Sequence, residues 1–190
     1  MTKGRLEAFS DGVIAILITI LVLELKIPHG ATWHALEPLV PIFLMYVLSF
    51  LVVGIYWVNH HHLLHTIERV TGGILWANLH LLFWLSMIPF TTGWMGENHN
   101  APLPTAIYGV VLVCAAFAYN ILSVTIIRAH GRDSRLARAV GGDRKGKLSV
   151  LLYVLSVPAA FVNVWISDAL WIAVIFIWFV PDRRIERVES

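Results

Sequence analysis

Charged residues and cysteines are scarce in this chain of 190 residues. Asp, Glu, Lys and Arg make up 14% of it, against about 25% in an ordinary soluble domain, and hydrophobic residues reach 58%. This apolar excess is too large for the core of one small domain, so the composition predicts an integral membrane protein. The single cysteine, Cys114, excludes an intrachain disulfide.

Several sequence signatures are also missing. The chain has no Walker loop, no GxGxxG sequence and no zinc-type Cys/His spacing, and no Ser/His/Asp arrangement has a recognisable context. His61 and His65 have helical i, i+4 spacing, but no carboxylate or cysteine completes a metal site in that segment. We therefore predict no enzyme, no metal, no cofactor and no nucleic-acid partner.

Apolar segments recur at the length that crosses a bilayer. We expect one all-α, six-helix transmembrane domain over residues 1–190, with helices over about 5–27, 36–60, 73–94, 104–128, 148–162 and 168–180. Pro158 predicts a kink in the fifth helix. Lys3 and Arg5 before a short apolar run also fit a secretory signal, but Glu7 and Asp11 interrupt the run and no A-x-A site follows.

Basic residues fall on one side of these expected helices. If the N-terminus is cytoplasmic, all of them except Lys26 are inside: Lys3, Arg5, Arg69, Arg128, Arg132, Arg135, Arg138, Arg144, Lys145, Lys147, Arg183, Arg184 and Arg187. This positive-inside pattern predicts a multi-pass protein of the cell membrane with both termini in the cytoplasm. The basic connector 128–147 is either a solvated loop or an amphipathic segment that touches anionic lipid.

The first expected helix has one aliphatic stripe. At about 100° per residue, the side chains of Ile16, Ile20, Leu23 and Ile27 point within roughly 40° of one line along the helix. Gly12 extends this line and Thr19 lies beside it. Asp11 points about 140° away from Ile16, so another face of the helix carries an acid that needs a partner.

An ionised carboxylate facing hydrocarbon costs about 2.5–3.5 kcal/mol, so Asp11 is expected to face the bundle. Polar residues of suitable depth end the second helix and begin the third. We predict a polar cluster in which Arg5, Ser10 and Asp11 meet some of Asn59, His62, Asn78 and His80. This cluster either responds to pH through its histidines or acts only as a packing clamp.

Two acids, Glu24 and Glu37, map to the outer ends of helices. They are either solvated end groups or the source of a weak field that attracts cations.

The start of the first helix carries a recognisable motif, R-x-x-x-F-S-D, made by Arg5, Phe9, Ser10 and Asp11. With Gly12 and the aliphatic run 13–23, it resembles the signature of the endolysosomal potassium channel family, the transmembrane protein 175 family and its bacterial homologues. Trp57 to His61, Asn78 and Pro89-Phe90 are further similarities. The resemblance implies a homotetramer in the lipid bilayer whose first helices line a pore for monovalent cations.

The resemblance also implies where the pore narrows. Rings of Ile16, Ile20 and Leu23 would form an aliphatic gate, and the Thr19 hydroxyl would lie beside it. Potassium would be preferred modestly over sodium, without a cofactor and without the TVGYG filter, which this sequence lacks. Two other functions remain open: a proton-coupled transporter or proton pathway that uses Asp11 and the histidines, and a membrane scaffold that transports nothing.

Overall fold

The described part of the chain is helical. The computed structural model describes residues 1–98, 101–131 and 144–179, and no strand occurs within these ranges. The elements, in chain order, are α1 (Lys3–Leu23), α2 (Trp33–Leu36), the 3-10 turn η1 (Glu37–Leu39), α3 (Val40–His65), α4 (Gly72–Ser86), α5 (Ile88–Glu97), α6 (Pro102–His130), α8 (Arg144–Val162) and α9 (Val164–Phe179). The expected all-α fold class is confirmed.

The helices have the length and composition of membrane spans. Within the described residues, five segments qualify: Lys3–Leu23, Trp33–His65, Gly72–Glu97, Pro102–His130 and Lys145–Val162. The sixth expected helix forms as α9, which is apolar but has only 16 residues. The chain is therefore a multi-pass membrane protein.

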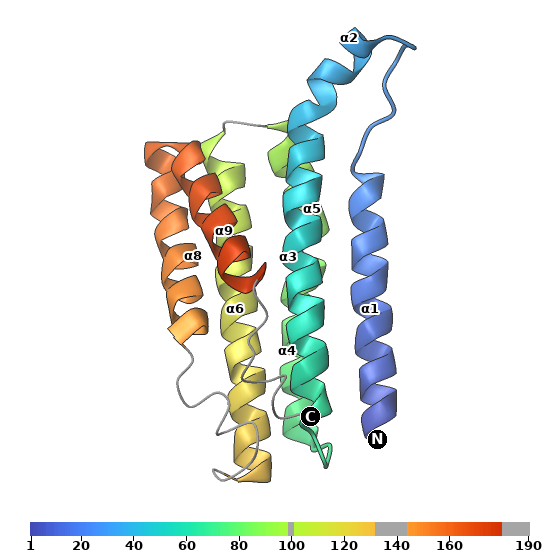
Figure 1. Cartoon of the computed structure of the whole chain (residues 1–190), viewed down its shortest axis with the longest axis vertical. Coiled ribbons are helices and arrows are strands. Elements are labelled where there is room, and N and C mark those ends of the chain that lie inside the picture. Colours follow the sequence, from blue (N-terminus) through green and yellow to red (C-terminus); the bar gives the residue numbers. More distant parts are fainter. Residues whose placement is uncertain (99–100, 132–143, 180–190) are drawn as a thin grey trace.

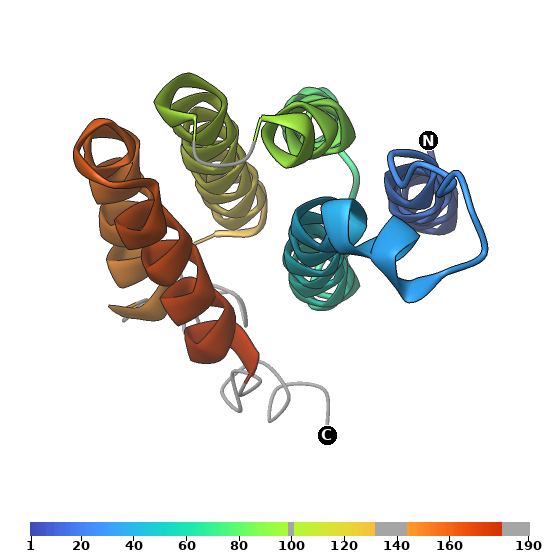
Figure 2. The ribbon, with the colours of Figure 1, turned by 90° about the horizontal axis from the view of Figure 1, so that it is seen from above.

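The long helices stand side by side, with α1 at one edge and α8 and α9 at the other (Figures 1 and 2). α1 packs on α3, α4 and α5, whereas α6 joins α4 to α8. Lys3 Nζ donates to the His65 carbonyl oxygen over 2.7 Å. The backbone N–H groups of Glu68 and Arg69 both donate to His130 Nε2 over 3.1 Å. These bonds hold the start of α1 and the ends of α3 and α6 at one end of the bundle. Residues 132–143 of the basic connector and the C-terminal arginines lie outside the described residues.

The first two helices differ from the expected ranges at their ends. α1 ends at Leu23 rather than at Ile27, since Pro28 disfavours helical conformation in the residue before it. Short elements, α2 and η1, occupy the expected start of the second helix. α3 continues to His65 instead of ending at residue 60, because Leu63 still packs into the core.

The third expected helix, residues 73–94, is divided in two. α4 and α5 are separated at Met87, and Pro89 follows in the first turn of α5. Pro89 has no N–H to donate to the Leu85 carbonyl, and its ring crowds that oxygen. Pro158, where a kink was expected, lies inside the continuous α8. α6 and α8 cover their expected ranges, and α9 begins at Val164 rather than at residue 168.

A buried polar network fixes α3 against the rest of the bundle. Ser49 Oγ lies 2.7 Å from Thr92 Oγ1 on α5 and 2.9 Å from the Tyr108 hydroxyl on α6. The Tyr108 ring packs against Trp171 of α9, with 4.8 Å between ring centroids. Because these hydroxyls are paired with each other, they join helices without leaving unpaired polar atoms in the apolar core. α3 is therefore a firm support for its other neighbour, α1.

Candidate pore helix and its polar anchors

α1 has one face in the protomer and one outside it. Its buried residues are spaced for a single helical face: Leu6, Ser10, Ile14, Leu17 and Leu21. On the opposite side, Ile16 is 58% exposed, Ile20 36% and Leu23 76%. We call these three residues the aliphatic ridge. The stripe identified in the sequence thus lies outside the protomer, except for Ile27, which falls beyond the end of the helix.

Ser10 connects α1 to α4 and α3 through a buried triad with Asn78 and His60. The Ser10 hydroxyl donates to the Leu6 carbonyl oxygen (2.9 Å) and accepts from Asn78 Nδ2 (2.9 Å). Asn78 Oδ1 then lies 2.7 Å from His60 Nε2, which must donate because an amide oxygen only accepts. All three side chains are almost completely buried. Within the described residues, His60 Nδ1 has no hydrogen-bond partner, so the imidazole is held through Nε2 alone.

Asp11 has a different partner from those expected. Its Oδ1 accepts from the indole N–H of Trp57 on α3 over 3.0 Å. Asn78 is bound to Ser10 instead, and His80 accepts from Trp84 on its own helix over 3.0 Å. The predicted cluster therefore divides, because adjacent residues of a helix point about 100° apart and reach different neighbours.

The other members of the predicted cluster lie outside the triad. Asn59 donates to the Ile55 carbonyl oxygen one turn earlier (2.8 Å), and His62 is half-buried near the end of α3. Arg5 and Phe9 are exposed. At about 100° per residue, both lie within roughly 20° of Ile16. The arginine and phenylalanine of the motif thus continue the exposed ridge, whereas its serine and aspartate bind the protomer.

The two anchors fix the rotation of α1. Viewed along the helix, Ser10 and Asp11 point about 120° and 140° away from Ile16, on either side of it. Their partners belong to different helices, α4 for Ser10 and α3 for Asp11. Two bonds to two neighbours oppose rotation of α1 and leave Ile16 and Leu23 exposed, whereas Ile20, at the edge of the ridge, also lines a groove against α5.

Thr19, beside the ridge, is exposed. Its hydroxyl donates to the Ile16 carbonyl oxygen over 2.8 Å. The proton is therefore directed into the helix, and the remaining oxygen lone pairs face outward, where they can accept from water or contact a cation.

The C-terminal end of α1 borders a groove of about 590 Å³ against α5. The Glu24 carboxylate lies so close to α5 that a Cβ atom on Gly93 would come within 2.9 Å of Glu24 Cδ. Lys26 Nζ and Glu97 Oε1, 2.6 Å apart, form an exposed ion pair across the same gap. Glu24 is therefore packed against the neighbouring helix rather than simply solvated. No group of three or more metal-binding side chains occurs in residues 1–98, 101–131 and 144–179.

Sequence reasoning missed two of these residues as specific partners. Trp57 and His60 both lie in the run W-V-N-H-H-H at the end of α3. They are three residues apart and therefore lie on one face of α3, from which Trp57 bonds to Asp11 on α1 and His60 to Asn78 on α4.

Comparison with known proteins identifies relatives along nearly the whole chain. A family model described as the endosomal/lysosomal potassium channel TMEM175 matches residues 5–89, which contain the ridge and both anchors. A potassium channel of Chryseobacterium sp. is 52% identical over 187 residues, which cover 98% of this chain and 97% of that protein. A potassium channel of Streptomyces collinus is 39% identical over 172 residues, 85% of this chain and 84% of that one.

A solved structure has the same fold. It is the crystal structure of a lysosomal potassium-selective channel TMEM175 homolog from Chamaesiphon minutus, with a TM-score of 0.83 and 27% identity over 95% of this chain and 97% of that chain. These relatives are named as channels and not as enzymes. The chain therefore belongs to the transmembrane protein 175 (TMEM175) family of potassium channels.

Proposed function

We propose that the chain is one subunit of a homotetrameric potassium-permeable channel of the cell membrane, and that α1 of each subunit lines the pore. The names of the relatives support the transport of potassium. The observation that carries the proposal is the orientation of α1, whose aliphatic ridge faces away from the protomer. Exposure alone is shared with lipid-facing side chains such as Phe117. α1 differs because the anchors Ser10 and Asp11 hold the ridge in one direction.

The gate in this proposal is the aliphatic ridge repeated around a shared axis. Rings of Ile16, Ile20 and Leu23 would narrow the pore and expel water, and a dewetted constriction blocks ions. The Cβ-branched side chains of Ile16 and Ile20 have few rotamers, so such rings would be stiff. A small outward movement of α1 would widen and wet them.

Selectivity in such a pore is modest. Aliphatic rings offer no oxygen atoms to replace the hydration shell of an ion. The outward lone pairs of Thr19 are the nearest protein oxygen beside the ridge, since its proton is held by the Ile16 carbonyl. A ring of these hydroxyls would contact a partly dehydrated monovalent cation at the constriction.

The chain would sit with both termini in the cytoplasm. Lys3 and Arg69 lie at the end of the bundle where α1 starts and α3 stops, and Arg128 is near the end of α6 at the same level. The positive-inside rule places this end in the cytoplasm. Glu24, at the opposite end of α1, would then lie near the outer mouth.

Potassium flux from liposomes tests the gate. Ile16→Asn introduces an amide at the constriction, so we expect it to wet the pore and raise basal flux about tenfold or more, an expectation that rests on gating by dewetting. Val22→Asn is the control, because Val22 is an exposed aliphatic residue of α1 that points about 120° away from Ile16. An unchanged flux for Ile16→Asn in intact tetramers would remove Ile16 from the gate.

Reversal potentials distinguish this channel from a proton pathway. With opposing potassium and sodium gradients, the channel predicts a potential that follows potassium and is nearly independent of pH. A potential that follows the proton gradient would instead favour the histidine and aspartate pathway.

A further inference from the structure

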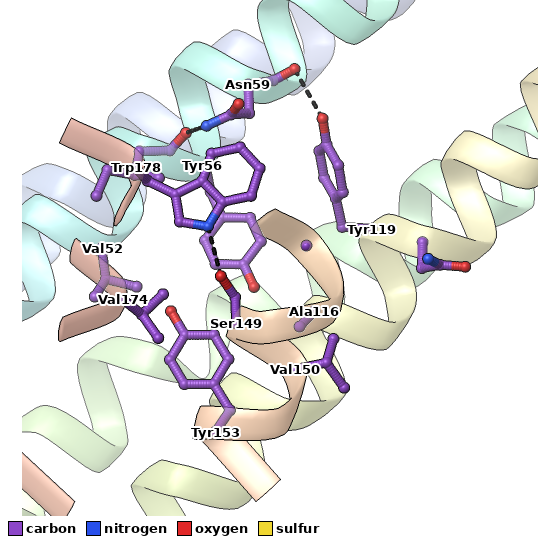
Figure 3. Close-up of a pocket in the computed structure, with 13 residues that line it drawn as sticks. Val52, Tyr56, Asn59, Ala116, Tyr119, Ser149, Val150, Tyr153, Val174 and Trp178 are labelled. Atoms are coloured by element: carbon purple, nitrogen blue, oxygen red, sulfur yellow. Dashed lines mark hydrogen bonds between the residues drawn. The ribbon is translucent and has the colours of Figure 1, made fainter. Parts of the chain in front are cut away.

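A second pocket lies far from α1, where α3, α6, α8 and α9 meet. Its space measures about 70 Å³, and aromatic rings of Tyr56, Tyr153 and Trp178 surround it (Figure 3). Small side chains make the room, since Ala116 of α6 and Gly146 of α8 also line it. α9 contributes Val174 and Trp178 to the wall of the pocket.

The described lining of the pocket contains no carboxylate, ammonium, guanidinium or imidazole group. None of the 13 lining residues is Asp, Glu, Lys, Arg or His. Transferring an ion into such surroundings is costly, since no opposite charge compensates the lost hydration. The ligand that fits this chemistry is therefore neutral.

Two tyrosines, Tyr56 and Tyr153, line the pocket, and their side chains are largely buried. Tyr56 is 9% exposed and Tyr153 5%. Neither phenolic oxygen forms a hydrogen bond with another described residue. Nearby groups are already used: Ser149 Oγ accepts from the Trp178 indole over 2.8 Å and donates to the Lys145 carbonyl over 2.9 Å. A phenolic hydroxyl can both donate and accept, so these two groups can exchange hydrogen bonds with a guest in the pocket.

The size of the pocket limits that guest. A dry cavity of about 150 Å³ accommodates benzene. The present space is about half as large, which suits a compact molecule of a few heavy atoms. Its apolar part would contact the Trp178 ring and Ala116, and its polar atom would reach the tyrosine hydroxyls.

We propose that this pocket is a binding site for a small neutral alcohol, of about two to four carbon atoms given the cavity size. The alcohol's hydroxyl exchanges hydrogen bonds with Tyr56 and Tyr153, and its alkyl group packs on Trp178. The site is independent of the pore proposed for α1. It is nevertheless one residue along α3 from Trp57, which binds Asp11, so the guest sits behind the helix that orients α1.

Fluorine NMR of trifluoroethanol tests the site in the full-length protein reconstituted in nanodiscs. We expect saturable broadening of the trifluoroethanol signal, reversed by propanol. Ala116→Leu fills the pocket and abolishes the saturable component. The matched control, Ala169→Leu, adds the same side chain at an exposed position on α9. This variant retains the saturable component. Should Ala116→Leu fail to assemble, Val150→Phe narrows the same pocket from α8. We expect this variant to abolish the saturable component as well.

The hydroxyl contacts have their own test. Tyr56→Phe and Tyr153→Phe each keep the ring and remove one hydrogen-bonding group, so we expect binding about five-fold weaker in each. Tyr46→Phe, which removes a hydroxyl outside the pocket, should leave binding unchanged. The proposal is overturned if trifluoroethanol broadens only in proportion to its partitioning into the nanodisc, or if the pocket-filling variants bind like the unmodified protein. Unweakened binding by both phenylalanine variants overturns it as well.

Discussion

Trp57 donates its indole N–H to Asp11 over 3.0 Å and thereby joins α3 to the charged residue at the start of α1. The preceding residue, Ser10, binds Asn78 on α4. Consecutive residues of one helix thus reach two different neighbours. This arrangement sets the rotation of α1, and the rotation in turn sets which side chains the protomer leaves outside.

Removing the indole N–H should loosen α1. Trp57→Phe keeps an aromatic ring but leaves the half-buried Asp11 without its donor, and we expect a loss of about 1 kcal/mol in the free energy of unfolding. Denaturant titration of the purified protein measures this loss. Trp76→Phe is the control, because Trp76 is 76% exposed. An equal loss in both variants would mean that the Asp11 contact contributes nothing specific.

Removing a partner from the buried triad should lower the free energy of unfolding more than removing the Asp11 contact does. Asn78→Leu preserves volume but leaves the His60 Nε2–H without an acceptor in the core, so we expect a loss of about 2 kcal/mol. Asn120→Leu, at an exposed position on α6, should change stability by less than about 0.5 kcal/mol. The same titration compares the two. Full stability of Asn78→Leu would show that the triad does not hold α1.

Much of α1 could be predicted from the sequence, because periodicity within one helix depends only on helix geometry. The ridge of Ile16, Ile20 and Leu23 follows from the repeat of 3.6 residues per turn. The involvement of Ser10 and Asn78 followed from the cost of burying polar groups in an apolar bundle.

Partner choice could not be predicted in the same way. Whether Asp11 meets Trp57 or a histidine depends on how α1 and α3 are rotated and shifted relative to each other, and spacing within either helix does not fix this. The positions of the helix ends could not be predicted from the sequence either. Pro89 divides a helix near its middle whereas Pro158 lies inside one, so the presence of a proline alone did not locate the break.

Two glycines of α5 offer a test of close packing at the end of the bundle where α1 ends. A Cβ atom on Gly96 would lie 3.2 Å from the Ile42 Cα, which is backbone and cannot move aside. On Gly93, it would instead meet the flexible end of Glu24. We expect Gly96→Ala to cost about 1–3 kcal/mol, whereas Gly93→Ala should cost less than about 0.5 kcal/mol because Glu24 swings toward water. Thermal unfolding in detergent ranks the two, and the reverse order would contradict the packing described for α5.

In the proposed channel, the ridge of α1 meets its copies around a shared axis, and cysteine cross-linking can detect this contact. In a Cys114→Ser background, Leu23→Cys and Val22→Cys each place one thiol on an exposed position at the same end of α1. After oxidation of the membrane-reconstituted protein, we expect covalent dimers for Leu23→Cys and monomers for Val22→Cys, as read on a denaturing gel. Monomers for Leu23→Cys, or equal cross-linking at both positions, would contradict it.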